Sequence, residues 1–209
     1  MSLHALPALF TMLLAAAQPS LGAETGADPA TAQTFRTADT RTLDYTKELY
    51  IRLEAPPGRS FCFPKGASSL AREGLFVPLL PGKCEDIRVT DAPPQVRITL
   101  HPNAVDDEWL LGQAYCSVDL HDMDDSTMDY TDLGRVNGLR AQGCVSSAPT
   151  SEHEPGYYGN AVTLFNGIGD VIAGAHYRIV AVGAPQYRAQ LDALLQDVLK
   201  GVHPTPVPK

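Results

Sequence analysis

The sequence has no surplus of basic residues and no long hydrophobic run. Its 209 residues include 16 Lys and Arg against 24 Asp and Glu, which gives a net charge of −8. This balance disfavours nucleic acid and anionic lipid as main partners, because both attract basic surfaces. No stretch approaches the about 18 consecutive apolar residues typical of a transmembrane helix, so we expect no transmembrane segment.

The chain also lacks the common local signatures of catalysis. It contains no Gly-x-Ser-x-Gly elbow, no His-Glu-x-x-His motif, no Gly-x-x-x-x-Gly-Lys phosphate loop and no Gly-x-Gly-x-x-Gly after a predicted strand. No two cysteines lie close enough in sequence for a zinc knuckle or a Cys-x-x-Cys exchange centre. We therefore expect a protein that is not an enzyme and that holds no resident cofactor.

The N-terminus has the pattern of a secretory signal. Residues 2–23 carry no Asp, Glu, Lys or Arg, and the apolar core at 6–17 has the length of a signal-peptide h-region. Small residues follow that core, so cleavage after Ala17 or Ala23 is expected. We assign 1–23 to a signal peptide and expect the mature protein in the periplasm or secreted.

The four cysteines are an even number, as expected of a protein folded in an oxidising compartment. Three pairings are open, and the sequence does not choose among them. The simplest joins Cys62 to Cys84 and Cys116 to Cys144, which closes two local loops. Each bridge is expected to stabilise the fold by about 3 kcal/mol through the unfolded state.

Turn-forming residues are abundant, and the chain length fits one domain. Gly and Pro together account for 34 of the 209 residues, which favours short elements joined by turns. We expect a flexible N-terminal lead over 24–42, one domain over 43–201 and an extended Pro-rich tail over 202–209.

Hydrophobic alternation and flanking turn residues predict a set of short strands. These cover residues 49–53, 61–64, 75–80, 96–100, 115–120, 139–146, 161–165 and 171–182. The strand over 139–146 is expected to pair with that over 115–120, because the Cys116–Cys144 bridge would join neighbours. Asn166-Gly167 is expected to form a hairpin turn, since both residues tolerate positive φ.

A C-terminal amphipathic helix is the clearest element. Pro185 suits its first turn and Gly201 its C-cap. Its apolar face consists of Tyr187, Leu191, Leu194, Leu195, Val198 and Leu199. The predicted fold class is α+β: an antiparallel sheet with this helix packed on one face, and two structural disulfides.

One acidic segment carries the whole net charge. From Ile98 to Gly134 there are nine acidic residues and no Lys or Arg, whereas the rest of the chain has 15 acidic and 16 basic residues. A solvated mobile loop, a calcium loop using Asp122, Asp124 and Ser126, and an interface for a cationic protein all fit this pattern.

We favour the interface, because aromatic and methionine residues alternate with the acids. The candidate partner-binding residues are Trp109, His121, Asp122, Asp124, Asp125, Asp129 and Tyr130. The aspartates would raise the association rate, and the two aromatic residues would anchor the partner. The alternatives are a metal-dependent envelope hydrolase using His121 with neighbouring carboxylates, and a calcium-binding envelope assembly factor.

These features together resemble the periplasmic immunity or inhibitor proteins that bacteria use against envelope-acting toxins. The segment from Phe61-Cys62-Phe63-Pro64 to Cys84 is similar to exported proteobacterial proteins. Residues 173–177, Ala-Gly-Ala-His-Tyr, resemble the Ser-Gly-x-x-Tyr loop of periplasmic lysozyme inhibitors, with Ala173 in place of serine; they also fit a strand, and we do not transfer that mechanism. The resemblance implies a non-enzymatic protein that occludes a basic toxin with its acidic segment.

Overall fold

A computed structural model describes residues 34–65, 74–87, 93–101, 127–148, 150–151, 156–168 and 171–207. These belong to a compact unit that spans 32–209, and the predicted signal peptide lies outside the described residues. The strands are β1 (Phe35–Thr37), β2 (Thr42–Tyr45), β3 (Ile51–Glu54), β4 (Cys62–Pro64), β5 (Leu75–Pro78), β6 (Gln95–His101), β7 (Thr127–Val136), β8 (Leu139–Ala148), β9 (Tyr157–Ile168), β10 (Val171–Gly183) and β11 (Val202–Pro204). The helices are the 3-10 turns η2 (Cys84–Asp86) and η4 (Pro185–Tyr187) and the α-helix α3 (Arg188–Lys200).

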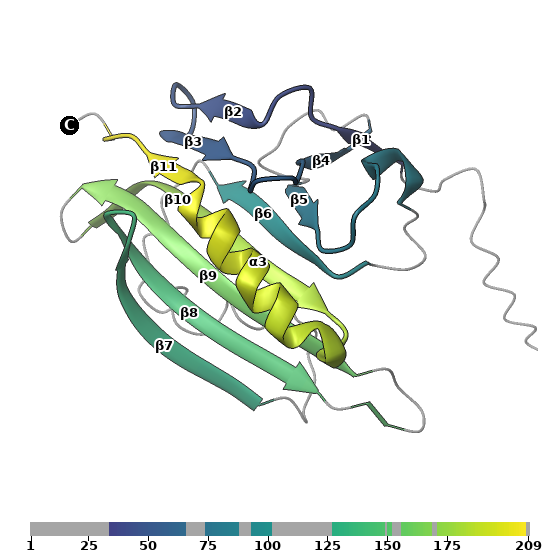
Figure 1. The fold of residues 1–209 in the computed structure, drawn as a ribbon. Helices are drawn as coiled ribbons and strands as arrows, with labels where there is room; N and C mark the ends of the chain where they lie inside the picture. Colours follow the sequence, from purple (N-terminus) through teal and green to yellow (C-terminus); the bar gives the residue numbers. More distant parts are fainter. Residues whose placement is uncertain are drawn as a thin grey trace, which may run out of the picture. The chain divides into compact units, whose positions relative to one another are not determined.

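The strands form two antiparallel sheets. The larger has the order β1-β4-β5-β6-β10-β9-β8-β7, and the smaller has the order β11-β3-β2. Helix α3 lies across one face of the large sheet, and β11 continues directly from its C-terminal end (Figure 1). The predicted α+β class is confirmed. No helix in the described part of the chain is long and apolar enough to cross a membrane.

The core lies between α3 and the large sheet. Alternate residues of β10, among them Tyr177 and Ile179, are fully buried on the helix-facing side. The helix buries the apolar face that its periodicity predicted, namely Leu191, Leu194, Leu195, Val198 and Leu199. Burying each of these side chains stabilises the fold by about 1.5–3 kcal/mol.

The predicted turn at Asn166-Gly167 is wrong. Both residues lie within β9, opposite Ala175 and Gly174 of β10. The Asn166 side chain is buried, and its amide donates hydrogen bonds to the main-chain oxygens of Tyr50 and Thr205. These partners lie far away in sequence, so no local pattern reveals why this asparagine stays in a strand.

The other Asn-Gly pair in the chain does form a turn. Asn137 (φ 51) and Gly138 (φ 83) join β7 to β8, and both have the positive φ that a tight hairpin requires. Strand β8 has β7 on one side and β9 on the other. The expected pairing of this strand with 115–120 is therefore wrong, and residues 115–120 themselves lie outside the described part.

Both ends of the described unit take part in sheets. Phe35–Thr37, within the segment expected to be a flexible lead, forms β1 against β4. The Thr37 amide and hydroxyl donate to the two carboxylate oxygens of Glu85, at 2.8 and 3.0 Å. Val202–Pro204, within the expected extended tail, pairs with β3 as β11. Partners distant in sequence supply the hydrogen bonds that order both segments.

The Cys62–Cys84 disulfide is confirmed, with a Cα–Cα distance of 5.4 Å. It ties β4 to η2, and its cysteines pack in a small buried cluster with Phe76. Cys144 is also disulfide-bonded. Cys116, the partner expected for it, lies outside the described residues, so the Cys116–Cys144 pairing stays a prediction.

Candidate functional site

The predicted partner-binding residues are only partly within the described chain. Trp109, His121, Asp122, Asp124 and Asp125 lie outside it, as does the calcium-type spacing that begins at Asp122. Asp129 and Tyr130 lie on β7, where they pair with Val145 and Cys144 of β8. The grouping of all seven residues into one site stays a prediction.

The end of the acidic segment forms an edge strand. A solvated mobile loop was one alternative for the acidic segment, but from Thr127 onward the chain is strand β7, so this alternative is wrong for that part. Main-chain hydrogen bonds to β8 order these residues despite their charge. Within the described residues β7 is the last strand of the large sheet, and no other described strand pairs with its outer edge.

The exposed edge of β7 is interrupted by a bulge. Residues 131–135 are exposed, and the register with β8 shifts between Asp132 and Gly134. The Asp132 carboxylate accepts a hydrogen bond of 2.8 Å from the Gly134 amide, and Gly134 has φ 66. Bulges and charged side chains on an edge strand limit unspecific pairing with other chains. The exposed part of this edge carries one carboxylate, Asp132, and one guanidinium, Arg135, whose Nη1 donates to the Gly138 oxygen at 2.7 Å.

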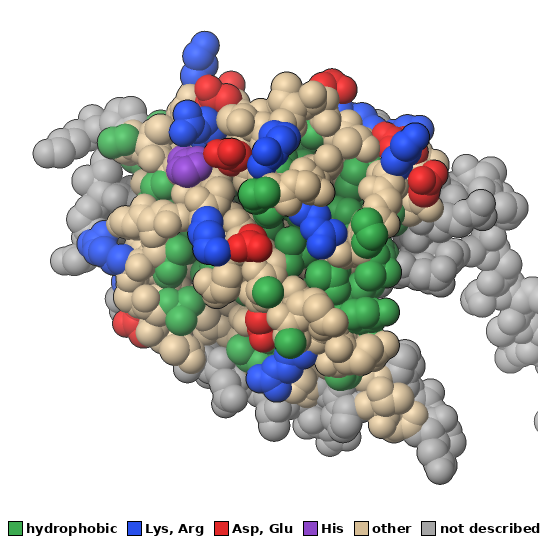
Figure 2. All heavy atoms as spheres, viewed as in Figure 1, with side chains coloured by type: hydrophobic (Ala, Val, Ile, Leu, Met, Phe, Trp, Pro, Cys, Tyr) green, Lys and Arg blue, Asp and Glu red, His purple; other side chains and the backbone are tan. Residues whose placement is uncertain are grey.

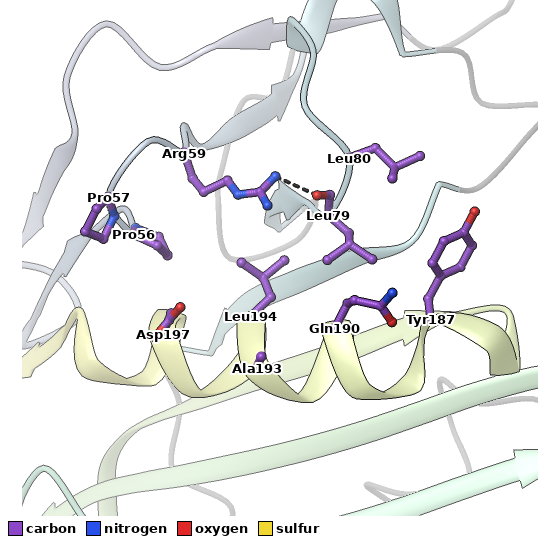
Figure 3. Close-up of a pocket in the computed structure, with 10 residues that line it drawn as sticks. All are labelled: Pro56, Pro57, Arg59, Leu79, Leu80, Tyr187, Gln190, Ala193, Leu194 and Asp197. Carbon is purple, nitrogen blue, oxygen red and sulfur yellow. Dashed lines mark hydrogen bonds between the residues drawn. The ribbon is translucent and has the colours of Figure 1, made fainter.

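A surface groove lies along α3 on the side of β5 (Figure 3). Its volume is about 460 Å³. It is lined by Pro56, Pro57, Arg59, Leu79, Leu80, Tyr187, Gln190, Ala193, Leu194 and Asp197. On this face of the molecule, hydrophobic side chains gather beside the helix, with basic side chains at their border (Figure 2). We call this feature the α3 groove. The sequence indicates no function for any of its residues.

Two local structures fix Arg59 at the wall of the α3 groove. The Arg59 amide donates to the Pro56 oxygen at 3.0 Å, closing a turn in which Gly58 has φ 72. The guanidinium Nη1 donates to the main-chain oxygens of Pro78 and Leu79, at 3.2 and 2.6 Å. The half-buried guanidinium is therefore held by the end of β5, and the main chain of Arg59 is held by its own turn.

The α3 groove is lined by one cation, Arg59, and one carboxylate, Asp197. Asp197 at one end is paired with Lys200 at 2.7 Å. Among the described residues no carboxylate forms an ion pair with Arg59. The groove brings together residues 56–59, 79–80 and 187–197. Their sequence signals are a Pro-Pro-Gly turn, a strand end and a helix, and these signals do not indicate a common site.

A second polar cluster fastens α3 to β9. The Tyr158 hydroxyl donates to Asp192 at 2.5 Å, and the Asn160 amide donates to the same carboxylate oxygen at 2.8 Å. Burial, together with the nearby Asp192 carboxylate, raises the pKa of Tyr158 to about 12. The residues that the structure describes include no group of three His, Cys, Asp or Glu able to hold a metal ion. The two hydrogen bonds to Asp192 position the helix on β9.

Comparison with known proteins gives a likeness of fold. No protein-family model matches the chain, and no curated protein matches it. The crystal structure of LpqN, a protein involved in cell envelope biogenesis of Mycobacterium tuberculosis, is similar with a TM-score of 0.50 and 15% identity, covering 82% of this chain and 92% of LpqN. Cyanobacterial PsbP (CyanoP) from Synechocystis sp. PCC 6803 is similar with a TM-score of 0.47 and 13% identity, covering 88% of this chain and 98% of CyanoP. At this identity the LpqN likeness concerns the fold alone.

Proposed function

We propose that this protein is a non-enzymatic binding protein that works outside the cytoplasm. Two observations support an extracytoplasmic location. The Cys62–Cys84 disulfide is fully enclosed in the fold, and structural disulfides persist in oxidising compartments. The fold is shared with LpqN, which is involved in cell envelope biogenesis. The signal-like N-terminus agrees with export to the periplasm.

The acidic edge strand β7 is the observation that carries the binding function. A long edge strand that ends an acidic segment combines main-chain groups available for pairing with negative charge that steers a cationic partner. Asp129 and Asp132 lie on this strand, and the other candidate aspartates precede it in sequence. Contact at β7 would cover the exposed residues 131–135 and bury the edge.

Within this function, the specific role we propose is that of an immunity or inhibitor protein. The partner would be a basic envelope-acting toxin, occluded by the acidic segment, with Trp109 and Tyr130 as anchors. The inhibitor role rests on the sequence and on the edge strand β7.

The test compares charge variants in capture and in direct binding. The variant carries Asp129→Asn and Asp132→Asn, and the matched control carries Asp39→Asn and Asp86→Asn, two exposed aspartates outside the acidic segment. A basic envelope protein should be captured by the parent and the control but several-fold less by the variant, and the purified partner should bind more weakly as salt rises. A second variant, which carries Asp122→Asn, Asp124→Asn and Asp125→Asn, tests the candidate aspartates that precede β7 in sequence. Equal binding by all forms contradicts the electrostatic mechanism.

Metal measurements separate this proposal from the calcium and hydrolase alternatives. Elemental analysis should find no stoichiometric metal, and millimolar calcium should leave the melting temperature unchanged. A calcium loop would raise the melting temperature, with less effect from magnesium. A metal-dependent hydrolase would lose its metal in a His121→Ala variant.

A further inference from the structure

The α3 groove has the dimensions of a short extended peptide. Its helical wall runs from Tyr187 to Asp197. Ten residues of helix rise about 15 Å, which is the length of about four or five residues in extended conformation. Side chains of a bound strand would alternate between the groove floor and the solvent.

The groove remains open to solvent along its length. Leu80 is 49% exposed, and Pro57, Gln190 and Ala193 are also exposed. Small-molecule sites bury about 70–90% of the ligand in a concave cavity. A groove with one open side cannot enclose a small ligand to that extent, but it can accept one face of a segment that belongs to a larger partner.

Arg59 is the lining residue suited to an acidic ligand, because Asp197, the carboxylate of the groove, is already paired with Lys200. Arg59 is fixed by the oxygens of Pro78 and Leu79 through a single nitrogen, Nη1. A guanidinium has five N–H donors in a planar fork, so donors remain for a carboxylate. Apolar side chains, among them Leu79 and Leu194, lie beside it in the groove, as Figure 3 shows. A carboxylate bound there would form a charge-assisted pair in a partly desolvated setting.

We propose that the α3 groove binds an extended segment of another protein in which one carboxylate lies between apolar side chains. The carboxylate pairs with Arg59, and the flanking side chains pack on Leu80, Pro57 and Ala193, the exposed apolar residues of the lining. This site lies on the helix, whereas the proposed acidic edge is β7, so the protein would have a second binding surface of opposite charge preference. The inference does not depend on the toxin-inhibitor role.

The test uses phage-displayed random heptapeptides selected on the purified protein. An enriched peptide is then synthesised with a fluorescent label, together with a counterpart in which its Asp or Glu is replaced by Asn or Gln. The variants are Arg59→Gln and Ala193→Glu; the second places a carboxylate in the groove at an exposed helical position. Ala189→Glu is the matched control, because Ala189 is an exposed residue of α3 that does not line the groove. Thermal melting verifies that each variant folds.

Enriched peptides should share an acidic residue between apolar ones. Both groove variants should weaken binding about tenfold or more, as should the amide counterpart of the peptide. Ala189→Glu and the Asp129→Asn, Asp132→Asn variant should bind as the parent does. The proposal is overturned if no peptide depends on the groove or if enriched peptides lack a carboxylate. Laurate is the probe for a lipid site. The proposal is also overturned if laurate binding depends on Arg59 while no peptide binds in the groove.

Discussion

The side-chain amide of Asn166 in β9 lies 3.1 Å from the hydroxyl of Tyr177 in β10. The Tyr177 hydroxyl in turn donates a hydrogen bond to the main-chain oxygen of Leu49. Through Asn166 and Tyr177, the large sheet is joined to the loop before β3 and to Thr205 beyond β11. One buried polar network thus holds together the two sheets and the C-terminal segment.

We expect Asn166→Ala to lower the free energy of unfolding by about 2–3 kcal/mol, because it removes the buried amide that donates to the oxygens of Tyr50 and Thr205 and to the Tyr177 hydroxyl. Urea unfolding of the parent and the variant measures the loss. Asn160→Ala is the control, since Asn160 is partly exposed and donates only to Asp192; it should cost about 1 kcal/mol. Equal losses in the two variants would contradict a special role for the Asn166 network.

Stability should fall at alkaline pH because of Tyr177. Burial raises the pKa of Tyr177 from 10.0 to about 12. The fold favours the neutral phenol. Its contribution to the free energy of unfolding is therefore complete below pH 10 and is lost as the pH rises toward 12. The shift corresponds to about 2–3 kcal/mol. Urea unfolding at pH 9, 10, 11 and 12 should show this decline, and Tyr177→Phe should make it shallower. The same slope in that variant would refute the assignment.

Asn137 is expected to stabilise the end of α3. From the β7–β8 turn, its amide donates to the oxygens of Leu199 and Val202, at 2.6 and 2.9 Å. Asn137→Gly preserves the left-handed backbone but removes both bonds, at a cost of about 1–2 kcal/mol. Asn137→Ala adds about 1 kcal/mol of backbone strain. Chemical denaturation should rank parent above Gly above Ala; a Gly variant as stable as the parent would show that the capping bonds contribute nothing.

Removing the Cys62–Cys84 bridge should cost about 3 kcal/mol, as expected for its sequence separation of 22 residues. The paired change Cys62→Ala and Cys84→Ala avoids a free thiol and is measured by urea unfolding. Non-reducing peptide mapping of the parent should recover two linked pairs, with Cys144 joined to Cys116. A free thiol, or Cys144 linked between two molecules, would disprove that second pairing.

Local sequence patterns determined the helix and several strands. The periodicity from Tyr187 to Leu199 identified both α3 and its buried face, because one turn of helix involves only near neighbours. The alternation in 96–100 identified β6 in the same way. Strand β7 was missed, since an edge strand with exposed residues on both faces shows no hydrophobic alternation.

The two Asn-Gly pairs show where local information ends. Both dipeptides suit a tight turn, yet only Asn137-Gly138 forms one, while Asn166-Gly167 continues β9. Register with β10 and hydrogen bonds to Tyr50 and Thr205 decide the second case. The α3 groove likewise exists only where three separated segments meet. The sequence alone determined charge, cysteine content and local periodicity, whereas tertiary structure decided the turns and sites whose free energy comes from contacts between residues far apart in the chain.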